Sequence, residues 1–368
     1  MKNLFPKIVG WLRLPHKEND QLSITRSQCF SVSQIAMDDR KDTFYIVRKN
    51  SEEIMDQITR RSFLKGAACL GGGALLSQSP LSSLAQTNPQ EPPAAEIKPN
   101  LVAVKGKDPY VNTLRAIQEL GGIEAFVRRG DRVGVLVNSP FKSIGASVNP
   151  DVVLAVIEKC IEGGAKEIHY LKDPHRGYWE RSPRSGNFAN VLKSLKYESG
   201  DHVKVEIPSG LSLKDARVTK DLWECDVFIN ISITKHHQGV HYTGALKNMM
   251  GLCPFSTNSY FHWGTLKLGW YGDLDHLNQC IADLNLVRKP DLCISDATTF
   301  ITENGPYGPG KLAGAETVVA STDRVSLDAF CCRFLGVQPE DVLMIRKASQ
   351  HGLGEMNLNR LRIKSLSV

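Results

Sequence analysis

One stretch of the chain, Lys235 to Asn248, concentrates side chains that can transfer protons or hold anions. It contains two lysines, Lys235 and Lys247, and three histidines, among them His237 just beyond an apolar run. A histidine near its ordinary pKa, or a lysine whose pKa is lowered by burial, can exchange a proton near neutral pH. We therefore expect His237 to act as an acid or base, and the two lysines to hold an anion or a cofactor.

Three further residues of this stretch, Thr243, Gly244 and Asn248, are expected to contribute to binding. A glycine lets the backbone approach a ligand closely, and the first turn of a helix beginning near Gly244 would favour an anion. The alternative is a surface loop in which His237 is bonded to the backbone and Lys247 is solvated.

Polar residues also follow the other strands that the sequence predicts. Ligands of open α/β sheets bind beyond the carboxyl ends of the strands, which directs attention to Asn138, His175, Asp296 and Glu303. We expect His175 to be a second proton-transfer group, although a surface turn would carry the same residues. Asp296 and Glu303 could share a cation or divide acid and base roles, or they could form a solvated acidic loop.

Metal-binding patterns are weak in this sequence, so any metal stays unidentified. His237 and His241 have the spacing of a zinc site on a helix, but Gly239 and the preceding strand favour a loop. None of the seven cysteines after Ala85 forms a Cys-x-x-Cys pair, so no iron–sulfur cluster motif is present. Several cysteines stand at apolar positions of predicted elements, which is typical of buried thiols.

Apolar runs and helical periodicities alternate along the chain, as they do in α/β proteins. They predict a mostly parallel sheet covered by helices, in Rossmann-like layers, and they also allow two lobes with a cleft between them. Strands are expected at 101–104, 132–137, 167–171, 226–233, 292–295 and 316–320, and helices at 111–126, 150–162, 244–252, 275–286, 324–335 and 342–349.

The N-terminal region resembles an export signal. Arg60 and Arg61 precede an apolar stretch at 66–76, and Ser83-Leu84-Ala85 has the small residues of a cleavage site. This order predicts a twin-arginine signal at 55–85, cleavage near Ala85, an encounter with the twin-arginine translocase, and a periplasmic or other extracytoplasmic location. The apolar stretch is shorter than the ~20 residues of a spanning helix, so no stable membrane span is expected.

The remaining boundaries follow from composition. Residues 1–54 precede the signal and are interpreted as a mis-annotated start, with Met55 as the true start, or as a disordered extension. The Pro-rich residues 86–100 predict a linker, 101–354 the folded domain and 355–368 a C-terminal tail. Of the 45 basic and 39 acidic residues, 12 and 8 precede residue 86, so the folded part is nearly neutral and no nucleic-acid partner is expected.

The chain resembles the domain-of-unknown-function 362 family. The run from Lys235 to Gly251 matches K-x-H-x-x-x-x-x-T-G-A-L-K-N-x-x-G, and shorter motifs recur in order. These are Asn149–Val153, Asp283–Asn285, Lys289–Leu292, Asn304–Pro306, Ser321–Asp323 and Leu327–Ala329. Members of the family are often exported or fused to iron–sulfur modules, and the resemblance implies no settled activity.

A more distant similarity is to the nickel-pincer lactate racemases. His237, Thr243-Gly244 and Lys247 resemble a His, a Ser-Gly pair and a Lys of that family, and His175-Arg176 resembles its His-Arg dipeptide. The resemblance implies that Lys247 carries a cofactor and that histidines exchange the α-proton of the substrate. Ala245-Leu246 stands where that family has Gly-Arg, and its early Asp-x-Thr-Arg motif has no equivalent here.

Two functions are therefore compatible with the sequence. The first is an exported enzyme that performs acid/base chemistry on a small anionic substrate, such as a hydroxy or carboxylic acid, with a bound metal or lysine-linked cofactor. The second is a non-catalytic exported protein that binds a metal or an organic anion. The sequence names neither the small-molecule ligand nor the oligomeric state.

Overall fold

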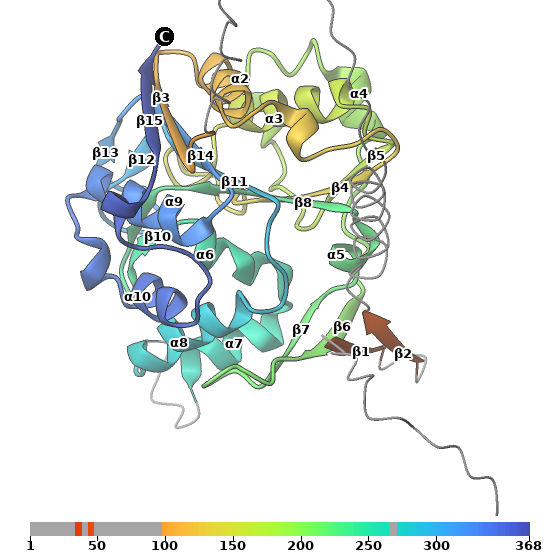
Figure 1. Ribbon diagram of the computed structural model, residues 1–368, viewed down its shortest axis with the longest axis vertical. Coiled ribbons are helices and arrows are strands. Elements are labelled where there is room, and N and C mark those ends of the chain that lie inside the picture. The colour runs from red at the N-terminus through yellow and green to blue at the C-terminus, as the bar shows by residue number, and fades with distance from the viewer. Residues whose placement is uncertain (1–33, 39–42, 48–97, 265–270) are drawn as a thin grey trace, which may run out of the picture.

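The computed structural model describes residues 34–38, 43–47, 98–264 and 271–368, and its main sheet has seven strands (Figure 1). Only β14 runs antiparallel to its neighbours, so the predicted α/β fold with a mostly parallel sheet is confirmed. The order is β15 (Ile363–Ser367), β3 (Leu101–Lys105), β14 (Thr317–Ser321), β11 (Leu292–Ala297), β8 (Val227–Ile233), β4 (Arg132–Val137) and β5 (Glu167–Tyr170).

Helices cover both faces of this sheet (Figure 1). Alternate residues of one strand enter different apolar clusters, as Val135 and Leu136 of β4 do, because successive side chains point to opposite faces. On one face lie α2 (Pro109–Glu119) and α3 (Pro150–Glu162). On the other lie α6 (Ala245–Asn248), α8 (Leu274–Leu284), α9 (Arg324–Cys331) and α10 (Leu343–Gln350), with α7 (Phe255–Trp263) beside α8.

The sequence signals at the ends of α3 work as expected. The side chain of Asn149 accepts a hydrogen bond from the amide of Asp151 at 3.0 Å, Pro150 occupies the first turn, and the helix ends at Gly163. β4 precedes α3 in the chain and β5 follows it. The two strands pair in parallel, which completes a βαβ unit.

Several elements were not predicted. A second sheet contains β2 (Thr43–Val47), β1 (Gln34–Asp38), β6 (His202–Glu206) and β7 (Asp215–Thr219). Two small hairpins are formed by β9 (Lys235–His237) with β10 (His241–Thr243), and by β12 (Phe300–Ile301) with β13 (Leu312–Ala313). The short helices α4 (Ala189–Ser194) and α5 (Asp221–Glu224) were not predicted either.

The C-terminal residues 355–368, expected as a tail, add a strand to the main sheet. β15 pairs in parallel with β3, and the backbone amide of Arg362 donates to the side chain of Asn100 at 3.0 Å. The sequence of β15 is short and half polar, which suits an edge strand and explains why its periodicity alone is uninformative.

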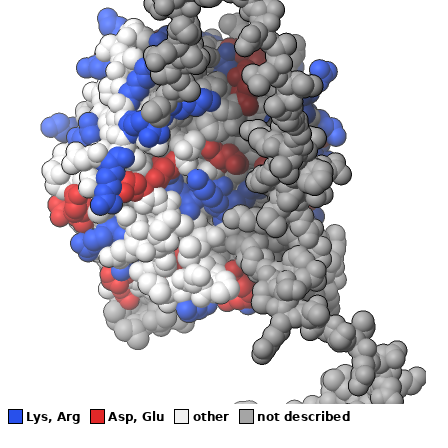
Figure 2. Space-filling model, in the orientation of Figure 1, with Lys and Arg blue, Asp and Glu red and all other residues white. Residues whose placement is uncertain are grey.

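The seven cysteines of the described residues are free and buried, as expected for structural thiols. No helix among these residues has the length and apolar character needed to cross a bilayer. Basic and acidic side chains are interspersed on the described surface of the face shown in Figure 2. The predicted signal at 55–85 and most of the linker lie outside the described residues, so export stays a prediction.

Candidate functional site

The residues after β8 turn back as the β9–β10 hairpin, in which His237 pairs with His241 across the two strands. His237 is buried and His241 is exposed with a φ of 63°. The turn contains Gly239, where an added Cβ would lie 2.7 Å from the ring of Tyr271. The segment is therefore not helical, in agreement with the expectation of a non-helical segment at this point.

The amides at the start of α6 do bind a carboxyl group, but that group belongs to the protein. The carboxylate of Asp328 accepts hydrogen bonds from the amides of Ala245 at 2.7 Å and Leu246 at 2.9 Å. A Cβ on Gly244 would lie 2.2 Å from Oδ1 of Asp328, so only glycine permits this approach. Gly244 thus brings the backbone close to a side chain of α9.

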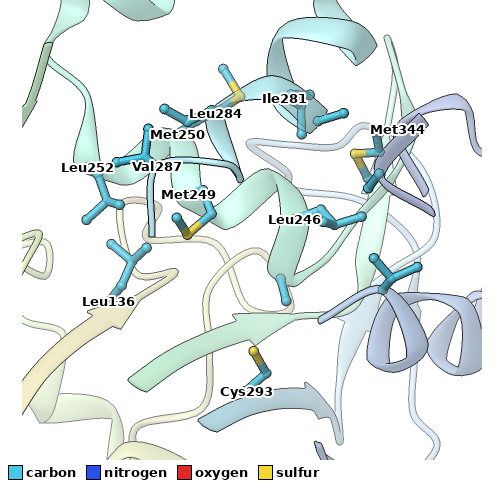
Figure 3. Packing of buried hydrophobic residues seen from close by; sticks show 14 of the residues in the cluster. Leu136, Leu246, Met249, Met250, Leu252, Ile281, Leu284, Val287, Cys293 and Met344 are labelled. Carbon is cyan, nitrogen blue, oxygen red and sulfur yellow. The ribbon is translucent and has the colours of Figure 1, made fainter. Parts of the chain in front are cut away.

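Apolar packing fixes the segment that carries Lys247. Leu246 and Met249 lie between the sheet residues Leu136 and Cys293 and the α8 residue Ile281 (Figure 3). The residues before and after Lys247 in the chain are therefore fixed by packing in the core, whereas Lys247 itself is half-buried. Such packing fixes the backbone at Lys247, which suits a functional group.

A pocket of about 230 Å³ opens beyond the ends of β4 and β8, and we call it the strand-end pocket. Six of the ten predicted site residues line it, namely Asn138, Lys235, His237, Thr243, Lys247 and Asn248. The other lining residues are Val137, Pro140, Phe141, Lys172, Met250, Gly251, Asn258, His262, Tyr271, Pro306 and Tyr307. No aspartate or glutamate occurs among these lining residues.

The amine of Lys247 contacts the thioether sulfur of Met250 at 3.5 Å. Burial lowers the pKa of this amine to about 8, because the charged form loses water. About one tenth of Lys247 is therefore unprotonated at pH 7, and about half at pH 8. An unprotonated amine in a pocket can accept a proton or attack a carbonyl carbon.

Lys235 is fully buried and joins two loops of the pocket wall. Its ammonium group donates to the carbonyl of Ala146 at 2.5 Å and to that of Pro306 at 3.0 Å, and it lies 4.5 Å from the centre of the Phe141 ring. Burial, together with the nearby charge of Lys247, lowers the pKa of Lys235 well below its usual value. A carboxylate bound beside Lys235 would favour its charged form, whose three N–H donors leave one for that ligand.

His237 is held as a neutral hydrogen-bond donor. Its Nδ1 accepts from the amides of Gly239 at 3.0 Å and Val240 at 3.3 Å, so the proton of the neutral ring is on Nε2. A second proton on Nδ1 would face those N–H groups. Burial, and then the charges of Lys247 and Lys235, lower the pKa of His237 far below its usual value.

Sequence reasoning missed a second histidine of the pocket, His262 of α7. Its Nδ1 donates to the carbonyl of Asn258 at 2.8 Å, so Nε2 carries the lone pair, the reverse of His237. Burial lowers the pKa of His262 to about 4, so the ring is neutral at neutral pH. The spacing within α7 gives little signal, because aromatic residues surround His262 and obscure its polar role.

Three polar atoms of lining residues are buried without a hydrogen-bond partner, Oδ1 of Asn138, Oγ1 of Thr243 and Oδ1 of Asn258. Thr243 is 3% exposed, and a buried unpaired polar atom is unfavourable unless a ligand or water pairs with it. By contrast, Asn248 donates to Asn230 at 2.7 Å and to backbone carbonyls of β4 and β8, which fixes α6 on the sheet.

His175 lies one loop away from the pocket. Its amide donates to the carbonyl of Ser139, which stands between the lining residues Asn138 and Pro140. Its Nδ1 donates to the carbonyl of Arg176 at 2.7 Å, and its Nε2 is buried without a partner. The proton-transfer role expected for His175 stays a prediction.

The two predicted acidic residues also lie outside the pocket lining. Asp296 is buried and accepts from the amide of Asn149 at 2.7 Å and from the amide and hydroxyl of Thr298 at 2.8 and 2.6 Å. Burial raises the pKa of Asp296, although these hydrogen bonds oppose the shift. Glu303 is exposed on the loop after β12.

Lys247 fits the attachment of a covalent cofactor better than the pocket histidines fit a metal. Its amine is partly unprotonated and opens on a pocket with room beside it. Within the described residues, no group of three His, Cys, Asp or Glu side chains could hold a metal ion. His237 would also need to lose the Nε2 proton before that nitrogen could bind one.

Comparisons with known proteins place these residues in a family. The family model described as "Domain of unknown function (DUF362)" matches residues 135–333, more than half of the chain. The thylakoid-associated protein sll1697 of Synechocystis sp. (strain ATCC 27184 / PCC 6803 / Kazusa) is 27% identical over 257 residues, which cover 66% of this chain and 74% of that protein.

Two solved structures resemble the chain more distantly. The lactate racemase apoprotein from Thermoanaerobacterium thermosaccharolyticum aligns with a TM-score of 0.39 and 12% identity, covering 63% of this chain and 56% of that one. A Thermotoga maritima protein aligns with a TM-score of 0.32 and 14% identity, covering 67% and 60%. The chain thus spans less than two thirds of either structure.

Proposed function

The chain belongs to the DUF362 family, and we propose that it is an enzyme that transfers a proton at the carbon next to the carboxylate of a small hydroxy or carboxylic acid. One observation supports this most strongly: three lysines and two histidines line the strand-end pocket, whose lining contains no carboxylate. Such a pocket favours an anion, and Lys247 has a pKa of about 8, which suits a proton acceptor.

In this proposal each cationic or polar group has a separate task. The ammonium group of Lys235 and the Nε2–H of His237 hold the oxygen atoms of the substrate. The amine of Lys247 takes the proton, so the C–H bond breaks and its electron pair moves into an enolate whose oxygen the two donors stabilise. The ammonium form of Lys247 then returns the proton to carbon. Nε2 of His262 is a second atom of the pocket that can accept a proton.

A lysine-linked cofactor is the alternative use of Lys247. Such a group would accept the electron pair released from the substrate carbon when bound. Lys235 and His237 would still hold the substrate oxygens, and His262 would then take the proton. The intact mass of protein purified from its own host distinguishes the two uses, because an adduct on Lys247 assigns the amine to attachment.

The test is deuterium exchange in D₂O with 2-hydroxy acids and simple carboxylic acids, using protein purified from its own host. We expect deuterium at the carbon next to the carboxylate, at a rate that rises with pH through about 8 as Lys247 loses its proton. Lys247→Met should lower the rate at least ~100-fold. The control Lys347→Met, which removes an amine bonded to Asp275 and Gln279 outside the pocket, should leave it unchanged.

Two outcomes would contradict the proposal. Carboxylates that bind without exchanging deuterium would indicate a binding protein and not an enzyme. Failure of every tested acid to bind, seen as no change in melting temperature, would remove the anion site itself.

A further inference from the structure

Two aromatic rings form one wall of the strand-end pocket. Phe141, from the loop after β4, and Tyr307, from the loop between β12 and β13, pack edge to face with ring centres 4.9 Å apart. Tyr307 is 56% exposed, although an aromatic ring gains most from being covered. An exposed ring at a pocket mouth, packed against a second ring, provides a surface for an apolar group of a ligand.

Lys235 links this wall of Phe141 and Tyr307 to the proposed carboxylate site. Its ammonium group bonds to carbonyls of both loops, through Ala146 and Pro306, and lies over the ring of Phe141. A carboxylate bound by Lys235 therefore has the aromatic pair as its immediate neighbour. The substituent of the acid, whatever its size, would extend along these rings.

The volume of the pocket exceeds what a three-carbon acid fills. A pocket of about 230 Å³ has room for several water molecules. A small hydroxy acid would leave water against Phe141 and Tyr307, whereas a ring would replace that water with apolar contacts. The released apolar area and the edge-to-face contact both favour the larger ligand.

We infer that the pocket selects carboxylic acids that carry a planar apolar group about the size of a phenyl ring. The inference rests on the proposed carboxylate site and adds the class of substituent. Lys235 and His237 bind the carboxylate, and Tyr307 and Phe141 supply the selectivity.

Calorimetric binding of propanoate, 3-cyclohexylpropanoate and 3-phenylpropanoate to the full-length protein tests this inference without requiring turnover. We expect 3-phenylpropanoate to bind at least ~10-fold more tightly than propanoate, with the cyclohexyl acid between them. Tyr307→Ala should weaken phenylpropanoate binding about 3- to 10-fold and propanoate binding by less than about 2-fold. Tyr197→Ala is the matched control, because Tyr197 is also 56% exposed and packs on another ring, Tyr170, at 5.6 Å.

Equal affinity for propanoate and 3-phenylpropanoate would overturn the selectivity and leave the carboxylate site intact. Tighter binding of the phenyl acid that Tyr307→Ala and Tyr197→Ala affect equally would also overturn it, because the wall would then not be the cause. If none of the three acids binds, the proposed function fails and the inference fails with it.

Discussion

The strand-end pocket differs from the three most deeply buried aspartates of the described residues, Asp283, Asp296 and Asp328, in how its polar groups are paired. Each aspartate is at most 1% exposed and has its oxygens occupied by backbone amides or side-chain donors. Lys247 of the pocket has a thioether as its neighbour instead. These three carboxyl groups therefore hold the fold together, whereas the amine of Lys247 is left to a ligand.

Asp283 illustrates the structural use of a carboxylate. Its Oδ2 accepts from the amides of residues 211–213 at 2.7–2.9 Å, and its Oδ1 contacts Gln279 and His351. Burial alone would raise the pKa of Asp283, but these bonds outweigh it and lower the pKa. A group so fully paired contributes to stability and has little capacity left for chemistry.

The largest expected effect comes from removing one of these carboxylates. Asp283→Ala should lower the free energy of unfolding by about 3–5 kcal/mol, because three amides and two side chains lose their acceptor. Asp275→Ala on the same helix removes a carboxylate that is 74% exposed, and should change stability by less than about 0.5 kcal/mol. Urea unfolding of both variants measures the difference, and similar losses would contradict the structural role of Asp283.

A smaller effect of opposite sign is expected in the pocket. Lys247→Met should raise the free energy of unfolding by about 1–3 kcal/mol at pH 7. At this pH the wild type is destabilised because its folded state buries a charged ammonium group. The folded pKa of about 8 lies below the unfolded value, so the wild type becomes more stable as the pH rises above about 8.

The stability difference between Lys247→Met and the wild type should therefore be largest below pH 8 and shrink toward pH 10. Urea unfolding at pH 7, 8, 9 and 10 measures this trend. A difference that is independent of pH would show that Lys247 is not desolvated, and would place it with the solvated surface lysines.

The smallest expected effect distinguishes two buried threonines. Thr243→Val should leave stability unchanged or raise it by up to about 1 kcal/mol, since the Thr243 hydroxyl has no partner to lose. Thr219→Val should lower it by about 1 kcal/mol, because the Thr219 hydroxyl donates to Asp221 at 3.1 Å. Equal losses in thermal unfolding would mean that Thr243 is structural and not reserved for a ligand.

Periodicity and capping residues predicted the main elements because these signals are local. The apolar run at 132–137 coincides with β4, and Asn149 and Gly163 lie at the two ends of α3, as expected. The β9–β10 hairpin, α7 and the edge strand β15 were missed. These segments are short or mixed in polarity, so tertiary contacts decide their conformation.

The same distinction between local signals and tertiary contacts holds for the candidate site. The sequence alone determined that Lys235, His237 and Lys247 follow a buried strand, and thus that they stand at the end of a sheet where ligands bind. It could not determine which protons these groups carry, because that depends on partners distant in the chain, or on a turn that forms only after folding. The tertiary structure added His262, assigned the anion site of α6 to Asp328, and set opposite tautomers for the two histidines.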